Sequence, residues 1–226
     1  MMAEGFIKYD IDNRVEAFSS MKGAALPYDV ILGDQVHDIK TTVIKDIRPN
    51  PDTLKGTDAL ITNIQSLAIG VRTADCIPIL LFDPVKQVIA AIHAGWKGTL
   101  RRIVNSAISQ MSLEYGCVPM DLRAEIGPGI SLESFQVGEE VPMTFKTLGF
   151  PIDRIYRWMG GKVEGNPATG HHIDLKEANR WIMETSGIRA ENIHDCGIDT
   201  FTDDSFCSAR REGNDCGRII TAIKLL

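Results

Sequence analysis

The sequence predicts an α+β fold in a single domain spanning residues 1–226, and three features of the chain lead to this prediction. Between residues 59 and 92, short apolar runs rich in β-branched residues follow one another with turn residues between them. From Leu100 onwards the apolar period lengthens from about two to about 3.6 residues, so helices lie after and between groups of strands. No repeat, linker or low-complexity tract divides the chain. This order favours α+β over a regularly alternating parallel sheet.

Composition and charge exclude several classes of protein. The 226 residues carry a formal net charge of −6 and no long run of Lys or Arg, which argues against nucleic acid as the main partner. No stretch of about 18 consecutive apolar residues is present, so we expect no segment to span a membrane. The 5 cysteines form no C-x-x-C pair and the first 20 residues do not resemble a signal peptide. We therefore expect reduced thiols in a cytoplasmic protein.

Short apolar runs and, at 36–44, alternation of apolar and polar residues predict the early strands, although the periodicity of the first thirty residues is weak. In chain order they are expected at 6–9, 15–19, 30–32, 36–44, 59–62 and 67–71. The strand at 36–44 carries His37 near its start. A loop is expected at 49–52, because the prolines there disfavour the helical conformation of the residues before them.

A β-hairpin is predicted next, and two chemically useful side chains lie near its open end. Apolar runs at 77–82 and 88–92 flank a polar connection at 83–87. If the turn is centred between Pro84 and Val85, Cys76 pairs directly with His93, with Cβ atoms about 4.5 to 5.5 Å apart. A thiolate and an imidazole at that distance can bind one metal ion at about 2.0 to 2.3 Å. A one-residue bulge would break this pairing.

An amphipathic helix follows the hairpin. Its apolar stripe consists of Leu100, Ile103, Val104, Ala107, Ile108 and Met111. The helix is expected to end at Gly116 and to begin within residues 95–99, directly after His93. Its unpaired N–H groups and positive dipole end are therefore expected near the predicted metal.

The second half of the chain has weaker patterns. We expect a strand at 122–126 leading into a turn at 127–129, a helix over 137–148, and a mostly irregular segment at 149–170. Asp174 is expected to cap a helix that stops at Gly187. The last strands are predicted at 193–198, 206–208 and 219–223.

The Cys76 and His93 pair indicates a metal site if a third ligand is available. A catalytic zinc usually has three Cys, His or carboxylate ligands and an open position for water. His37 is the best remaining candidate, while His171, His172 and His194 are alternatives. The other interpretation is a buried cysteine that packs as a small apolar side chain beside a hydrogen-bonded histidine.

Several other residues could bind an anion or a planar ligand. Arg210 and Arg211 could clamp an anion, or could form exposed ion pairs with neighbouring acidic residues. Arg72 could bind an anion or brace the loop that carries Cys76. Trp96 could stack on a planar ligand or anchor the start of the helix.

The chain resembles the YfiH-like, or peptidoglycan-editing-factor, family, whose members are also labelled laccase-domain or polyphenol-oxidase proteins. The matching motifs extend in family order over nearly the whole chain. They are Gln35-Val36-His37, Thr57-Asp58-Ala59-Leu60, Val71-Arg72-Thr73-Ala74-Asp75-Cys76, His93-Ala94-Gly95-Trp96-Lys97-Gly98, Ile126-Gly127-Pro128, Val137-Gly138-Glu139-Glu140-Val141, Asp174-Leu175, Phe206-Cys207-Ser208-Ala209-Arg210-Arg211 and Gly217-Arg218.

The resemblance implies a fold, a metal and an activity. It implies a layered α/β/β/α sandwich with mixed sheets, and a zinc ion bound by His37, Cys76 and His93. It also implies a purine nucleoside enzyme that cleaves adenosine, inosine and methylthioadenosine with phosphate and deaminates adenosine. For the phosphate and the nucleoside, our candidate residues are Arg72, Trp96, Lys97, Arg210 and Arg211. We expect a monomer or a weak homodimer.

Alternative functions remain open from the sequence. A copper-dependent polyphenol oxidase is disfavoured, because a multicopper centre needs more imidazoles than 5 scattered histidines provide. Cys76, activated by His93, could instead be the nucleophile of a hydrolase that edits peptidoglycan precursors. A binding module without catalysis is a further alternative. The chain departs from the family pattern in a shortened segment between residues 20 and 36, and in Gly129 and Asp199, where relatives usually carry cysteines.

Overall fold

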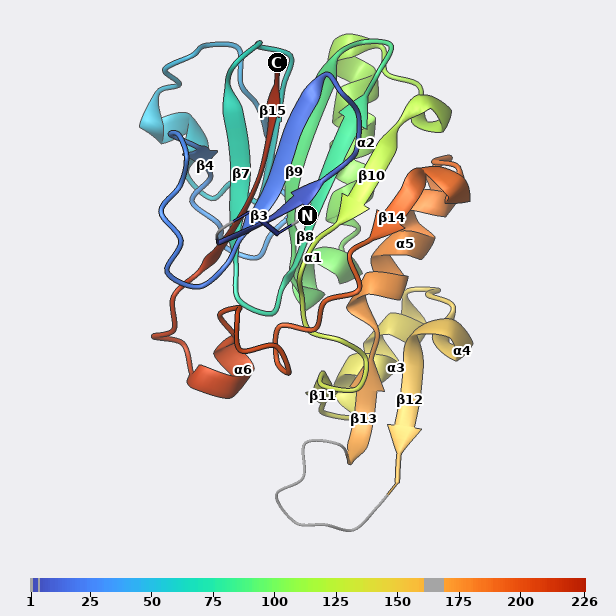
Figure 1. Ribbon diagram of the computed structural model, residues 1–226. Helices are drawn as coiled ribbons and strands as arrows, with labels where there is room; N and C mark the ends of the chain where they lie inside the picture. The colour runs from blue at the N-terminus through green and yellow to red at the C-terminus, as the bar shows by residue number, and fades with distance from the viewer. Residues whose placement is uncertain (1, 4, 161–168) are drawn as a thin grey trace.

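The computed structural model describes residues 2–3, 5–160 and 169–226 and confirms the predicted α+β class. In this part of the chain, two six-stranded sheets pack face to face and a smaller three-stranded sheet lies at one end (Figure 1). The first sheet has the order β1 (Met2–Ala3), β2 (Phe6–Tyr9), β3 (Val15–Ser20), β15 (Ile219–Leu225), β7 (Ala68–Thr73), β4 (Ile31–Leu32). The second has the order β14 (Ile193–Asp195), β10 (Arg123–Ile126), β8 (Ile77–Asp83), β9 (Val88–Ala94), β6 (Ala59–Thr62), β5 (Thr41–Val43).

The remaining elements complete one side and one end of the sandwich. The small sheet has the order β11 (Gln136–Val137), β13 (Gly170–Ile173), β12 (Tyr156–Met159). The α-helices are α1 (Trp96–Leu100), α2 (Ile103–Tyr115), α3 (Glu140–Thr147), α4 (Ile152–Ile155), α5 (Leu175–Thr185) and α6 (Ala209–Glu212). Short 3₁₀ turns occur at Pro51–Leu54, Pro119–Asp121 and Ala190–Asn192. None of these helices is long and apolar enough to cross a membrane.

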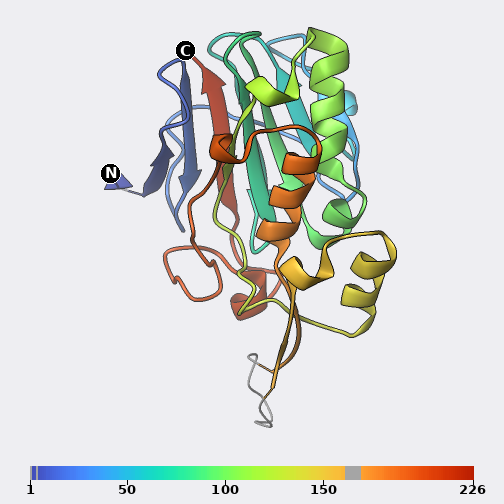
Figure 2. The ribbon, with the colours of Figure 1, turned by 90° about the vertical axis from the view of Figure 1, so that its right-hand side faces the viewer.

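Both large sheets are mixed, as predicted. β4 runs parallel to β7, and β10 runs parallel to β14, while most other neighbours are antiparallel. Helices α2 and α5 cover the outer face of the second sheet (Figure 2). Irregular chain covers part of the outer face of the first sheet, where Tyr28 packs edge-to-face on Phe18. The described residues therefore show the α, β and β layers in the expected order.

The predicted hairpin forms the centre of the second sheet. Every residue of β8 and β9 is buried, because one face packs on the helices and the other on the first sheet. Ile79, Leu81 and Ile92 point to the helical side, whereas Leu80, Phe82 and Ala91 point between the sheets. This double burial explains the continuous apolar runs in the sequence.

The predicted register of the hairpin is wrong. Pro78, not Cys76, lies directly opposite His93, and Ile77 pairs with Ala94. The turn occupies residues 84–87, so its centre is one residue later than expected. The Asp83 carboxylate fixes this turn, because it accepts hydrogen bonds from the backbone of Val85 and Lys86 at 2.8 and 2.9 Å.

The predicted helix after the hairpin is present but divided. Its apolar stripe extends over α1 and α2, which are separated at Arg102, a residue with a φ of 61°. Gly116 ends α2 with a φ of 68°, as its position in the sequence predicts. Asp174 caps α5 by accepting from the backbone N–H of Glu177 at 2.9 Å, which is also as predicted.

Other boundaries differ from the predictions. The strand expected at 36–44 is limited to β5, and His37 lies on the preceding loop with a φ of 63°. Val137 belongs to β11, so the helix expected over 137–148 is the shorter α3. No strand forms at 206–208, which instead leads into α6. The irregular segment at 149–170 contains α4 and β12, and its residues 161–168 lie outside the described part of the chain.

Candidate metal centre

Three chain segments bring His37, Cys76 and His93 together. His37 comes from the loop before β5, Cys76 from the turn that enters β8, and His93 from near the end of β9. One possible ligand atom from each residue lies within 4.8 Å of the other two. The Cys76 Sγ is 3.8 Å from His37 Nε2, and the two imidazole rings meet edge-to-face at 4.7 Å. In the described part of the chain, this is the one cluster of His, Cys or carboxylate groups with metal-site spacing.

The cluster forms although Cys76 and His93 are not directly paired. Asp75 has a φ of 83°, in a region that residues other than glycine rarely adopt, and it turns the chain just before Cys76. The other histidines considered as third ligands are engaged elsewhere. His171 contacts the Tyr156 hydroxyl through Nδ1 at 3.1 Å, and His194 contacts Glu125 through Nδ1 at 2.8 Å.

Asp58 supports two of the three donors, a role that its sequence pattern does not indicate. Its Oδ1 lies 2.7 Å from His93 Nδ1, which leaves Nε2 of that ring free for a metal. The backbone N–H groups of Val36, His37 and Asp38 donate to the same carboxylate at 3.0 to 3.1 Å. One fully buried side chain thus orients His93 and holds the loop of His37. The signal available in the sequence was an acidic residue directly before the apolar run at 59–61.

The charges in the cluster favour a thiolate. Burial raises the pKa of the Cys76 thiol, but hydrogen bonds and positive charge from His37 and His93 outweigh it and lower the pKa to about 6. Burial lowers the pKa of His93, but the hydrogen bonds to Asp58 and Cys76 outweigh it and raise the pKa to about 9. The thiolate is the form of cysteine that binds a metal.

The donor set fits a catalytic zinc ion. One thiolate and two imidazoles, with no fourth His, Cys or carboxylate ligand in the described residues, leave one coordination position open. Gly95 keeps space beside the donors, since a Cβ there would lie 3.0 Å from His37 Cδ2 and 3.1 Å from Cys76 Sγ. Gly95 is also the residue from which α1 begins, so the start of this short helix lies next to the cluster, as predicted.

A cavity of about 460 Å³ adjoins the cluster. Its volume is within the usual range of small-molecule sites, about 300 to 1,000 Å³. The cavity is lined by the three donors, by Arg72, Trp96 and Arg210, and by Phe135, Asn214 and Arg218. Phe135 and Asn214 were not singled out in the sequence, because neither belongs to a charged or metal-binding pattern.

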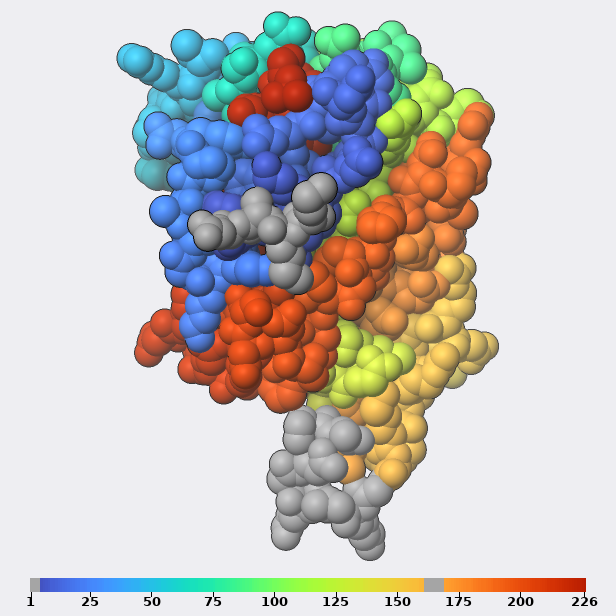
Figure 3. Space-filling model, viewed as in Figure 1, coloured from blue at the N-terminus to red at the C-terminus, as the bar shows by residue number. Residues whose placement is uncertain are grey.

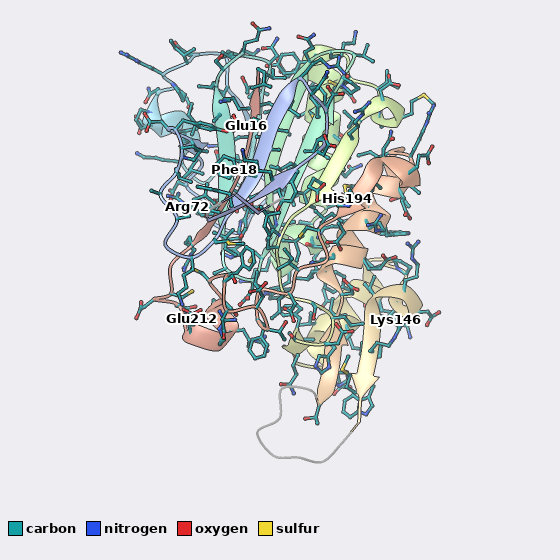
Figure 4. All side chains as sticks on the ribbon, in the orientation of Figure 1. Glu16, Phe18, Arg72, Lys146, His194 and Glu212 are labelled. Atoms are coloured by element: carbon teal, nitrogen blue, oxygen red, sulfur yellow. The ribbon has the colours of Figure 1, made fainter. Side chains whose placement is uncertain are left out.

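The arginines of the cavity are only partly engaged. Arg72 donates from Nη2 to the Gly33 carbonyl at 2.7 Å, and Arg210 donates from Nη2 to the Gln136 carbonyl at 3.0 Å. The Arg210 guanidinium also stacks over the Phe135 ring at 5.6 Å. Within the described residues, Nε and Nη1 of both arginines have no protein partner. Arg72 (Figure 4) therefore serves as a brace and also faces the cavity.

Lys97 and Arg211 lie outside this lining. The Lys97 ammonium is 5.7 Å from the centre of its neighbour's indole ring, that of Trp96. Arg211 donates to the carbonyls of Thr200 and Phe201 at 2.7 Å and to that of Phe206 at 2.6 Å. Its guanidinium binds the C-terminal segment together and does not line the cavity.

Comparisons with known proteins cover nearly the whole chain. Residues 8–226 match the family described as "Multi-copper polyphenol oxidoreductase laccase". The chain is 38% identical over 205 residues to adenosine deaminase RL5 from an unknown prokaryotic organism, covering 86% of this chain and 74% of that protein. It is 37% identical over 207 residues to a purine nucleoside phosphorylase from Bacteroides thetaiotaomicron, covering 88% and 74%. The crystal structure of Bacillus licheniformis hypothetical protein YfiH superimposes with a TM-score of 0.87 at 26% identity, covering 99% of this chain and 97% of that one.

Proposed function

The chain belongs to the family described as "Multi-copper polyphenol oxidoreductase laccase", and from this premise we propose that it is a zinc-dependent purine nucleoside phosphorylase that also deaminates adenosine. The substrates are adenosine, inosine and methylthioadenosine, which phosphate cleaves to the free base and a sugar 1-phosphate. One observation carries the proposal: three metal donors and two partly free guanidinium groups line a single cavity of about 460 Å³. The names of the two relatives, an adenosine deaminase and a purine nucleoside phosphorylase, support the same substrate class.

The protein's own residues divide the work in this proposal. His37, Cys76 and His93 hold the ion, and Asp58 orients His93 through Nδ1. When bound, zinc supplies a Lewis acid and lowers the pKa of its water towards neutrality. The mixed thiolate and imidazole set favours zinc, whereas a multicopper centre needs more imidazoles than this cluster has.

In this proposal, the arginines and aromatic residues of the cavity lining bind phosphate and nucleoside. Arg72 and Arg210 each present unused N–H groups to the cavity. One guanidinium group can donate two parallel hydrogen bonds to two oxygens of a phosphate. Trp96 and Phe135 offer aromatic surfaces for a planar base. Lys97 and Arg211 keep only supporting parts in this proposal, because neither lines the cavity.

The proposal is tested with purified protein, adenosine or inosine, and phosphate. We expect release of the free base, and a loss of at least about 100-fold in kcat/KM for the Cys76→Ala variant. Elemental analysis should give one zinc ion per chain. Base release no greater than in Cys76→Ala, or several copper ions per chain, would contradict it.

A second candidate is a cysteine hydrolase that acts on peptidoglycan precursors. The observation in its favour is the Cys76 thiol itself, whose pKa of about 6 and contact with His93 resemble an activated nucleophile. A metal-bound thiolate is not free to attack. Full hydrolase activity of metal-free protein, abolished by a thiol alkylator, would select this candidate over the first.

All 5 cysteines are free thiols, which supports a reducing compartment, and we propose the cytoplasm.

A further inference from the structure

We infer that Asp75 is a positioning residue that fixes the Arg210 guanidinium relative to the metal centre. The inference rests on the proposed function for its role in phosphate use. Asp75 precedes Cys76 in the turn between β7 and β8 and is only 9% exposed. Its φ of 83° is a strained conformation that must be held in place by its surroundings.

The carboxylate of Asp75 joins two segments from the C-terminal part of the chain. Oδ2 accepts a hydrogen bond from the backbone N–H of Arg210 at 2.7 Å, and Oδ1 accepts one from the Thr200 hydroxyl at 2.7 Å. The backbone carbonyl of Asp75 accepts from the N–H of Ile130 at 2.9 Å. Three segments distant in sequence therefore meet at this one residue.

The contact with Arg210 occurs at the first turn of α6. Ser208 caps this helix by accepting from the N–H of Arg211, and Asp75 takes the adjacent free N–H of Arg210. The turn between β7 and β8 and helix α6 lie at the same end of the molecule (Figures 1 and 2). In the space-filling view, the orange-red residues that precede β15 form the surface below the blue N-terminal part of the chain (Figure 3).

Asp75 lies between the metal donor Cys76 and the cavity wall formed by Arg210 and Phe135, and it connects the two. On one side it is bonded through the chain to Cys76, a metal donor. On the other side it holds the backbone of Arg210, whose guanidinium stacks on Phe135 in the cavity wall. Loss of the carboxylate would free the start of α6 and let the guanidinium move with respect to the metal. Phosphate affinity should then fall. His37 and His93 stay in place because Asp58 supports them, and Cys76 stays with them because the Asp75 backbone keeps its own hydrogen bond to Ile130.

Asp199 provides a matched control in the same region. Its carboxylate accepts from the N–H and hydroxyl of Ser131, from the Ser134 and Thr202 hydroxyls and from the N–H of Phe201. Among the described residues it bonds neither to the Cys76 turn nor to α6. Asp199→Ala thus removes more side-chain hydrogen bonds than Asp75→Ala, five against two, but leaves the Asp75 carboxylate and both of its donors unchanged.

The test compares Asp75→Ala, Asp75→Asn and Asp199→Ala as zinc-loaded proteins. Titration calorimetry with inorganic phosphate gives Kd, assays give KM for phosphate and for inosine, and elemental analysis gives zinc per chain. We expect Asp75→Ala to raise Kd and KM for phosphate about tenfold, with KM for inosine within about twofold and zinc retained. Asp75→Asn should restore phosphate affinity to within about threefold, because its amide can accept from Arg210 N–H and donate to the Thr200 hydroxyl.

The outcomes separate this inference from the proposed function. Wild-type phosphate affinity in Asp75→Ala, an equal loss in Asp199→Ala, or loss of zinc from Asp75→Ala would overturn it. If Asp75→Ala does not fold, Thr200→Val takes its place, with a weakening of phosphate binding of about threefold expected and no weakening contradicting the inference. Absence of phosphorolysis in the wild type would instead refute the proposed function, and calorimetry would still test the positioning role.

Discussion

At the scale of single residues, the buried carboxylate of Asp58 supports two of the three donors of the candidate metal centre. It receives four hydrogen bonds, one from His93 Nδ1 and three from the backbone around His37. These bonds lower the pKa of Asp58 despite its burial, so the side chain stays ionised beside His93. A charged partner on Nδ1 makes Nε2 a better metal ligand.

We expect Asp58→Asn to weaken zinc binding by about 10- to 100-fold, since the neutral amide cannot accept all of these hydrogen bonds. Competition with a chromogenic chelator measures the change. Asp83→Asn is the control, because Asp83 is equally buried but fixes the distant hairpin turn. Zinc affinity that is equal in Asp58→Asn and the wild type would refute the role given to Asp58.

The three residues that cluster in the candidate site could be singled out from the sequence, whereas Asp58 could not, for a physical reason. Cys76, His93 and His37 carry chemistry that is visible in the sequence as residue type. The importance of Asp58 arises from contacts with residues 20 or more positions away, which no local pattern records. The same holds for Arg210 and Arg211, which are adjacent in sequence but differ in where their guanidinium groups lie.

At the scale of elements, local sequence patterns predicted which segments form helices and strands better than they predicted which residues pair across the hairpin. The buried runs of β8 and β9 are recognisable because both faces of the hairpin are apolar. Its register depends on a side chain, Asp83, and on a φ of 53° at Gln87, so the pairing of Cys76 with His93 was wrong. The break between α1 and α2 was missed because the apolar stripe continues across Arg102.

The start of α1 packs directly against two donors of the candidate metal centre. A methyl group at Gly95 would press on His37 and Cys76 at 3.0 to 3.1 Å. We expect Gly95→Ala to reduce zinc affinity by the equivalent of about 1 to 3 kcal/mol, the usual effect of overpacking. In Gly98→Ala on the same helix, the nearest contact is an ordinary 3.4 Å, so zinc binding should be unchanged. Equal zinc affinity in the two variants would contradict this account.

At the scale of the whole molecule, the two large sheets are joined by polar contacts as well as by their apolar interface. Asp12, between β2 and β3 of the first sheet, accepts from Arg123 on β10 of the second sheet at 2.8 Å. Arg14 bonds to Asp12 and also donates to the Pro84 carbonyl in the hairpin turn at 2.8 Å. These contacts join the β2–β3 turn of the first sheet to the β8–β9 turn and the start of β10 in the second sheet.

This cluster should make stability depend on pH. The hydrogen bond and charge of Arg14, helped by Arg123, lower the pKa of Asp12 from 3.8 to about 2. A lowered carboxyl pKa stabilises the folded state above the unfolded pKa, and this contribution is lost as pH falls through about 4 to 2. Because the arginines are partly exposed and screened, we expect Asp12→Asn to cost about 1 kcal/mol at pH 7.

Urea denaturation at pH 7 and near pH 2.5 checks this expectation. The difference in unfolding free energy between wild type and Asp12→Asn should shrink at the lower pH, whereas Asp10→Asn, an exposed neighbour, should differ little from wild type at either pH. A difference that is the same at both values would show that Asp12 acts without its charge.

The central claim is that the metal centre and the arginine-lined wall act on one bound nucleoside. A crystal structure of the zinc-loaded protein with inosine and phosphate tests it most directly. We predict a single zinc ion on His37, Cys76 and His93, with the nucleoside in the adjoining cavity and phosphate against Arg72 and Arg210. A metal on other residues, or a nucleoside bound away from this cavity, would contradict the account.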